Sequence, residues 1–341
     1  MSKILTISVA AYNIEKYIDK LMSTFDGLDD SVMNKMEVIV ENDGSSDATA
    51  ARVNEYVEMW PGTIRLNNKE NGGYGSTINA SIKLAKGKYF KQLDGDDWYV
   101  KENLPEFLEF LEHHEADLII SPYNECYEEE DGSIKVYERV SHTQIPEEDT
   151  DIENVKITQN LLMHELAVKT ELLQKNSIRI TERCFYTDNE YTCLPLLKAH
   201  SIARFGKPVY CYRLGLGEQS VSLSGLRKHY RDNIRMTARI CKEFSRDKGR
   251  MAGSVEDYML NLKLKSIVKN TYTAYMVLEH PEDGRKELMK FDRYLRIKYP
   301  EIYAKSGESK RVRIPRVLGF VGYNAFAAYV LKDFEKSLKK R

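Results

Sequence analysis

Short apolar strands alternate with amphipathic helices through the first hundred residues, and this alternation constrains the fold more than any other feature. We expect strands at residues 4–10, 37–41, 63–67 and 89–93, and helices at 15–25, 47–59 and 76–86. In the last of these helices, Ile78, Ile82 and Ala85 recur at helical spacing. The alternation predicts an α/β fold whose mostly parallel sheet has helices on both faces. Ligands of such sheets bind beyond the carboxyl ends of the strands, so the residues that follow each strand are the candidates for a site.

The pattern changes after residue 98. We expect a helix at 102–113, a strand at 118–121, an acidic hairpin between 123 and 153, and short elements at 166–169, 170–175 and 190–198. From about residue 226 only helical patterns remain, at 227–248, 255–278 and 286–298. A domain boundary is therefore expected near residue 225.

Composition limits the class of protein. With 51 Lys and Arg against 52 Asp and Glu, the net charge of -1 argues against a surface devoted to nucleic acid. The five cysteines form no Cys-x-x-Cys pair, which speaks against a disulfide framework or a structural zinc site and favours a cytoplasmic setting. The first apolar run is too short for a signal peptide, and no run reaches the length of a spanning helix.

Three carboxylates follow the strand expected at 89–93 within four residues. They are Asp94, Asp96 and Asp97, and Trp98 comes next. Like charges this close repel each other, and a divalent cation removes that cost. Oxygen ligands suit Mg²⁺ or Mn²⁺, which also bind substrate phosphates. An acidic turn that caps the next helix accounts for this run equally well.

Two other strand ends carry signals. After Asp43, Gly44 permits a turn and Ser46 or Asp47 can cap a helix, but this leaves Asp43 unexplained. A carboxylate there can accept a hydrogen bond from a base N–H. The glycines of residues 71–79 open a helix, where a phosphate can approach closely. Ile78 occupies the place of a third glycine, so this is not a dinucleotide fingerprint.

In their order and spacing, these segments resemble the family 2 glycosyltransferases, which have the nucleotide-sugar-binding GT-A fold. The likeness spans most of residues 4–222. Residues 8–13 are similar to the family's opening strand, 41–47 to its Asp-Asp-Gly-Ser-x-Asp, 71–79 with 85–89 to its asparagine–glycine loop and following turn, and 94–97 to its Asp-x-Asp-Asp. Further on, the matching segments are 169–173, 187–191, 208–213 and 220–222. Asn42, Ile78 and Thr187 depart from the pattern, and Ile78 weakens any claim about phosphate contacts there.

The resemblance implies an inverting, metal-dependent glycosyltransferase that uses a nucleoside-diphosphate sugar, with UDP favoured, and Mn²⁺ or Mg²⁺. It implies a catalytic domain over 1–225, with a nucleotide-binding half at 1–98 and an acceptor half at 99–225, followed by a helical region at 226–341. The acceptor would be a carbohydrate, lipid-linked or protein-linked hydroxyl in bacterial polysaccharide or glycoconjugate synthesis. Nucleic acid is not an expected partner, and a homodimer is left open.

The resemblance also assigns roles to residues. Asp188 would be the catalytic base and Asp96, with Asp94, would hold the cation. The nucleotide would be bound by Ala11, Tyr12, Asn13, Asp43, Gly73, Asn79, Asp94 and Gly95. Less specific candidates are Asp97, Trp98, Glu190, Arg213 and His164. Glu190 competes with Asp188 for the role of base, and His164 fits packing as well as an acceptor pocket.

Two rival functions stay open at this stage. A nucleotidyltransferase on a related sheet should show a basic glycine-rich loop after the first strand, and residues 11–14 offer none. A non-catalytic scaffold that binds sugar nucleotides should have lost a site carboxylate, and none is lost.

The end of the chain is basic. From Lys310 to Arg341 there are nine Lys or Arg and two Asp or Glu. Apolar residues lie between the basic ends: Val317, Leu318, Phe320, Val321, Tyr323, Phe326, Tyr329, Val330 and Leu331. Such a tail either lies on an anionic membrane, at the inner face of the cell membrane, or packs on the protein.

Overall fold

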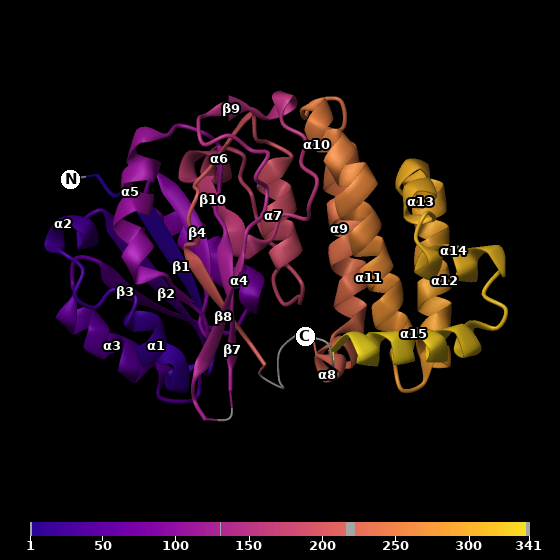
Figure 1. The fold of residues 1–341 in the computed structure, drawn as a ribbon. Coiled ribbons are helices and arrows are strands. Elements are labelled where there is room, and N and C mark those ends of the chain that lie inside the picture. Colours follow the sequence, from indigo (N-terminus) through magenta and orange to yellow (C-terminus); the bar gives the residue numbers. More distant parts are fainter. Residues whose placement is uncertain (1, 130, 216–221, 339–341) are drawn as a thin grey trace. The chain divides into compact units, whose positions relative to one another are not determined.

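The structure is a computed structural model that describes residues 2–129, 131–215 and 222–338, and it divides into two compact units. The first spans Met1–Gly215 and the second Leu216–Arg341 (Figure 1). Residues Ser220 and Val221 of the last matching segment, and 339–341 of the basic tail, lie outside the described residues.

An eight-stranded sheet forms the centre of the first unit, with the order β3-β2-β1-β4-β10-β6-β11-β9. Four neighbouring strands are parallel: β1 (Leu5–Ala11), β2 (Met36–Asp43), β3 (Ile64–Lys69) and β4 (Tyr89–Asp94). The other half consists of β10 (Leu166–Lys169), β6 (Leu118–Ile120), β11 (Ser201–Arg204) and β9 (Thr150–Asp151). Strand β10 runs antiparallel to both β4 and β6, which the sequence did not indicate. The predicted α/β class is confirmed.

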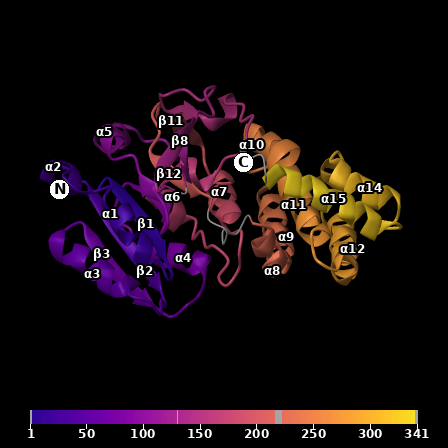
Figure 2. The same cartoon turned by 60° about the horizontal axis from the view of Figure 1, so that its bottom comes forward.

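Helices cover both faces of this sheet (Figures 1 and 2). They are α1 (Ile18–Met22), α2 (Asp30–Met33), α3 (Thr49–Met59), α4 (Tyr74–Leu84), α5 (Leu104–His113), α6 (Thr170–Lys175) and α7 (Asp188–Leu196). Because both faces are covered, the central strands are buried on both sides. In β1, Leu5, Ile7 and Val9 are fully buried on one face, and Thr6 and Ser8 are fully buried on the other.

A smaller four-stranded sheet, β5-β12-β7-β8, lies in the same unit. Its strands are β5 (Trp98–Tyr99), β12 (Tyr210–Leu214), β7 (Tyr123–Glu128) and β8 (Ile134–Arg139). Strands β7 and β8 form the hairpin expected within 123–153, and every residue of β8 is exposed. Pairing of β12 with β5 brings residues near 211 to the acidic run that ends at Asp97.

From Leu223 onward the described elements are all helices, as predicted. They are α8 (Leu223–Lys228), α9 (Tyr230–Asp247), α10 (Gly253–Tyr258), α11 (Leu264–Met276), α12 (Pro281–Lys298), α13 (Pro300–Ser306), α14 (Lys310–Val317) and α15 (Tyr323–Leu338), and a π-helical turn (Met259–Lys263) joins α10 to α11. Within this unit α15 packs on α11 and α12, with Tyr323, Ala327 and Val330 buried. Among the described residues, no helix combines the length and the apolar character needed to cross a lipid bilayer.

Candidate functional site

Four parallel strands end at one edge of the large sheet. The register pairs Ala10 with Asp94, Ala11 with Asn42, and Asp43 with Lys69. The segments that follow β1, β2, β3 and β4 therefore open on the same side, and these segments carry most of the predicted site residues.

The loop after β1 is tied to the loop after β2. The Asn13 amide N–H donates to Ser45 Oγ (3.0 Å), and the Ser46 N–H donates to Asn13 Oδ1 (2.9 Å). Asn13 has a φ of 53°, a left-handed conformation that asparagine tolerates. Ala11 is buried at the strand end, whereas Tyr12 is 54% exposed. The tyrosine ring is thus available to a ligand beside two loops that are held together.

Asp43 organises the glycine loop that follows β3. Its buried carboxylate accepts hydrogen bonds from the N–H groups of Gly72 (2.9 Å) and Gly73 (2.8 Å) and from the hydroxyl of Ser76 (3.2 Å). The ammonium of Lys69 also pairs with it. The sequence assigned Asp43 to base binding and gave no sign of these internal donors.

The carboxylates of the acidic run after β4 lie close together and are partly or fully buried. Asp94 accepts a hydrogen bond from the hydroxyl of Tyr74 (2.8 Å). Burial, and then the charge of Asp96, raise the pKa of Asp94 to about 7, and burial also raises the pKa of Asp96. At neutral pH a positive charge is needed to keep this cluster fully ionised.

Asp97 anchors the acidic run to β12. Its two carboxylate oxygens accept hydrogen bonds from the hydroxyl of Tyr210 (2.6 Å) and the N–H of Arg213 (2.7 Å). Burial, followed by the charges of Asp96 and Asp94, raises the pKa of Asp97 well above its ordinary value. Both carboxylate oxygens of Asp97 are therefore already occupied by donors from β12.

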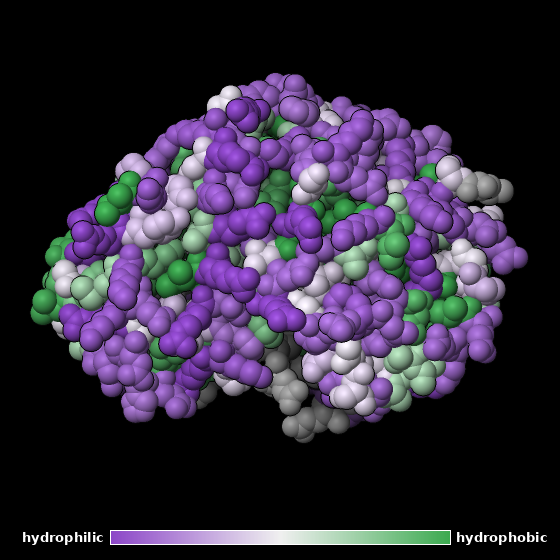
Figure 3. Space-filling view, turned by 180° about the vertical axis from the view of Figure 1, so that it is seen from behind, coloured by the Kyte–Doolittle hydropathy of each residue, from purple (hydrophilic) through white to green (hydrophobic). Residues whose placement is uncertain are grey.

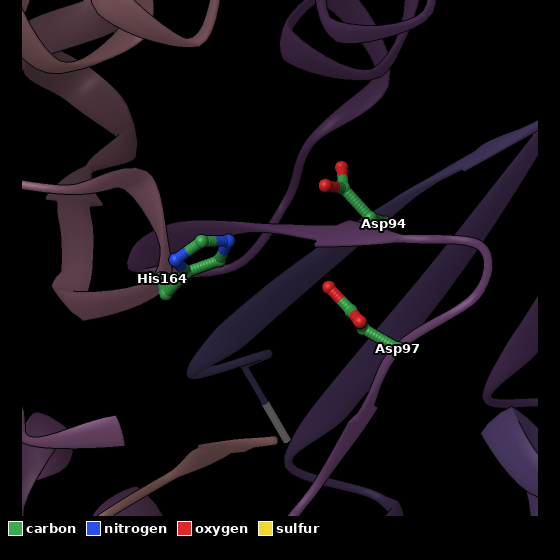
Figure 4. Close-up of side chains that lie close together, drawn as sticks. All are labelled: Asp94, Asp97 and His164. Atoms are coloured by element: carbon green, nitrogen blue, oxygen red, sulfur yellow. The ribbon is translucent and has the colours of Figure 1, made fainter. Parts of the chain in front are cut away.

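Asp94, Asp97 and His164 each offer one ligand atom, and these three atoms lie within 4.8 Å of one another. Their side chains turn toward a common space (Figure 4). The sequence favoured Asp96 with Asp94 as the metal pair. Among the described residues, the potential ligand atoms that lie close together belong to Asp94, Asp97 and His164. Asp97 therefore takes the place expected for Asp96, and His164 is an additional candidate ligand.

His164 sits among aromatic rings on the short turn Met163–Glu165. Its ring stacks on Tyr212 at 4.1 Å between centroids and lies 4.7 Å from the ring of Tyr210. Burial, with the nearby charge of Lys91, lowers the pKa of His164 to about 3, so the imidazole is neutral at pH 7. Within the described residues, Nδ1 is buried and has no hydrogen-bond partner. A neutral imidazole suits a metal ligand.

Gly95 and Arg213 shape the turn around Asp96. A Cβ on Gly95 would lie 2.6 Å from the carbonyl oxygen of Ala10, so only glycine fits there. Arg213 Nε donates to the Asp96 carbonyl (2.8 Å), and its guanidinium lies 5.1 Å from the centroid of the Trp98 ring. Arg213 and Trp98 thus support the turn that presents the Asp96 side chain.

Asp188 is the first residue of α7 and is half-buried. Its charge contributes to the raised pKa values of Asp94, Tyr74 and Tyr212. Because such effects decline with distance, Asp188, the predicted base, lies near the acidic run.

Glu190 and Asn79 hold the segment that leads into α7, residues 180–187. Glu190 is fully buried and accepts hydrogen bonds from Thr181 N–H (2.7 Å) and Oγ1 (2.8 Å). The Asn79 amide bonds both ways to the backbone of Ile180, at 2.8 Å each. The sequence proposed these two as base and nucleotide ligand, and the structure shows both engaged inside the protein.

The glycine loop also meets residues 180–187. The Arg183 N–H donates to the Gly72 carbonyl (2.7 Å), and a Cβ on Gly73 would lie 3.2 Å from Arg183 Cα. A Cβ on Gly75 would lie 2.2 Å from the carbonyl oxygen of Thr181. The lack of side chains at these glycines lets residues 180–187 of the same chain pack closely against the loop. From the sequence we had expected a phosphate to approach closely there.

Sequence reasoning missed Tyr74 and Tyr210. Tyr74 binds Asp94, and the Tyr210 hydroxyl binds Asp97 and accepts from the Asp94 N–H (3.1 Å). Both lie inside segments that resemble the family, but no spacing links Tyr210 to a carboxylate 113 residues away.

The chain is similar to known proteins in both sequence and fold. Residues 6–170 match the family model described as glycosyl transferase family 2. Over these residues the chain is similar to glycosyl transferase family 2. It is 32% identical over 124 residues to the putative glycosyltransferase EpsH of Bacillus subtilis, a stretch that covers 36% of this chain and 35% of that relative. The match thus covers about a third of the relative's length.

Two solved structures share the fold of this chain. The S. aureus TarS 1–349 structure in complex with UDP-GlcNAc has a TM-score of 0.70 and 19% identity, over 98% of this chain and 92% of that one. The mannosyltransferase PcManGT from Pyrobaculum calidifontis, in complex with GDP-Man and Mn²⁺, has a TM-score of 0.50 and 14% identity, over 97% and 87%. These likenesses establish the GT-A fold that the sequence predicted.

Proposed function

We propose that this chain transfers a sugar from a nucleoside-diphosphate sugar, with UDP as the nucleotide, to a hydroxyl acceptor, with inversion at the anomeric carbon. One observation carries the proposal. The acidic run Asp94–Asp97 and the start of α7 lie close enough for the charge of Asp188 to act on Asp94. The nucleotide sugars bound by TarS and PcManGT support this class of donor.

The acidic run fits a divalent cation, Mn²⁺ or Mg²⁺. Burial raises the pKa values of Asp94, Asp96 and Asp97, so the cluster gains stability from a positive charge placed within it. Asp94 and Asp96 would hold the ion, since both oxygens of Asp97 already have protein donors. A ring nitrogen of His164 lies within reach of Asp94 and would be a further ligand. When bound, the ion supplies charge neutralisation for the departing diphosphate.

The remaining steps belong to the chain's own residues. The exposed ring of Tyr12, beside Asp43, would face the base, and Asp94 would contact the ribose. Asp188 would accept the proton of the acceptor hydroxyl as its oxygen bonds to the anomeric carbon, while the bond from that carbon to the diphosphate breaks. One displacement inverts the centre and needs no covalent sugar–enzyme intermediate.

We further propose that the acceptor is a carbohydrate, lipid-linked or protein-linked hydroxyl in bacterial polysaccharide or glycoconjugate synthesis. This proposal rests on the match of residues 6–170 to the family model.

The test is calorimetric binding of UDP and of several UDP- and GDP-sugars with Mn²⁺ and with a chelator, together with donor hydrolysis. We expect binding that depends on the metal and is lost in Asp96→Ala, while the folded state persists. Gly62→Ala is a matched control, because nothing lies within 4 Å of the added Cβ. Equal nucleotide affinity with and without metal, in the wild type and in Asp96→Ala, would contradict the proposal.

A further inference from the structure

The two units carry opposite charge. The second unit, residues 216–341, has 28 Lys and Arg against 15 Asp and Glu, a net of +13. The first unit has 23 against 37, a net of -14. The net charge of the whole chain is near zero only because the two units have opposite charges. The helical unit is strongly basic, and an anionic surface would attract it.

An apolar turn comes to the surface of this basic unit between α14 and α15. Val317 is 77% exposed, Leu318 52% and Val321 72%, and we call these three residues the apolar turn. Phe320 between them is buried and fixes the turn from inside. Aliphatic side chains grouped in this way are costly in water, so they indicate an interaction site. In Figure 3, hydrophobic patches appear over the helical unit as well as over the first unit, between larger hydrophilic areas.

Basic residues flank the apolar turn. On α14, Lys310 and Arg313 are exposed and precede Val317 by seven and four positions, which places all three along one side of the helix. The other two arginines of α14 are engaged within the unit, since Arg311 pairs with Asp333 and Arg316 with Asp292. On α15, Tyr329, Lys332 and Lys336 are exposed. The helix thus separates cations that fix its own unit from cations that face outward.

We propose that the apolar turn inserts into an anionic lipid surface, with Lys310 and Arg313 against the headgroups. A soluble polyanion would satisfy the charges but would leave the three aliphatic side chains in water, whereas a bilayer interface accommodates both. The buried side of α15 already packs on its own unit, so the contact is made by the turn and not by a free amphipathic helix. This inference goes beyond the proposed transfer reaction and does not depend on it.

The test is flotation of the full chain with vesicles of phosphatidylcholine alone and of phosphatidylcholine with phosphatidylglycerol. We expect flotation only with the anionic vesicles. The variant Val317→Ser/Leu318→Ser/Val321→Ser should lower the partition coefficient by about tenfold or more, because it removes the inserted apolar area. Lys310→Glu/Arg313→Glu should also lower it by about tenfold or more.

A matched control removes three apolar residues from the exposed hairpin of the first unit, as Val136→Ser/Tyr137→Ser/Val140→Ser, and should float like the wild type. Thermal unfolding and circular dichroism of each variant check that the fold is kept. The inference is overturned if the wild type does not float with anionic vesicles, or if the turn variant floats as well as the wild type. It is also overturned if soluble polyphosphate binds wild type and turn variant alike and abolishes flotation, since the partner is then a polyanion.

Discussion

Asp188 and Glu190 lie two positions apart at the start of α7, yet the protein places them in different surroundings. Asp188→Asn should keep donor binding and lower the transfer rate by about 10²–10⁴, because an amide cannot take the acceptor's proton. Glu190→Gln should instead cost about 1–3 kcal/mol of unfolding free energy, since its carboxylate accepts two buried hydrogen bonds from Thr181. Single-turnover kinetics and urea unfolding of both variants separate the roles. Normal transfer by Asp188→Asn would exclude it as the base.

Lys91 lies inside β4, fully buried, and donates to the carbonyl oxygen of His164 (2.8 Å). Burial lowers the pKa of Lys91 from 10.5 to about 7. Between these values the unfolded chain holds a proton that the folded chain lacks, so the unfolding free energy should rise with pH. The slope is up to about 1.4 kcal/mol per pH unit. Urea unfolding from pH 7 to 10 should show this rise in the wild type and a smaller one in Lys91→Met. Equal slopes would mean that Lys91 keeps its charge.

The start of α4 packs closely against residues 180–187. Gly75→Ala would drive a Cβ into the Thr181 carbonyl, so we expect a loss of about 1–3 kcal/mol and a fall in transfer as the segment before Asp188 shifts. Gly62→Ala, in open space, should change neither. Thermal unfolding and transfer assays check the pair, and a Gly75→Ala protein with native stability would show that the two elements do not need this close approach.

Prediction from sequence succeeded where the signal lies within one element and failed where two elements meet. The strand–helix order and the acidic run after β4 are local patterns, so they were visible in the sequence. The hydrogen bonds of Asp43 to Gly72 and Gly73, and of Asp97 to Tyr210, join residues 29, 30 and 113 positions apart. Such pairs depend on how β12 and the glycine loop pack, which no periodicity encodes. The antiparallel β10 was missed for the same reason, because direction in a sheet depends on the connections.

At the scale of the whole molecule, the division of charge has a consequence for how the protein behaves in solution. Its sequence pI of about 6.7 describes neither part, because one part is strongly acidic and the other strongly basic. A chain of this kind offers binding surfaces to anion and cation exchange resins alike at neutral pH. At low ionic strength copies of the molecule also attract each other, acidic part to basic part, and salt screens that attraction over about 10 Å at 0.1 M. Solubility should therefore improve as salt is added, the reverse of the trend for a protein that carries charge of one sign.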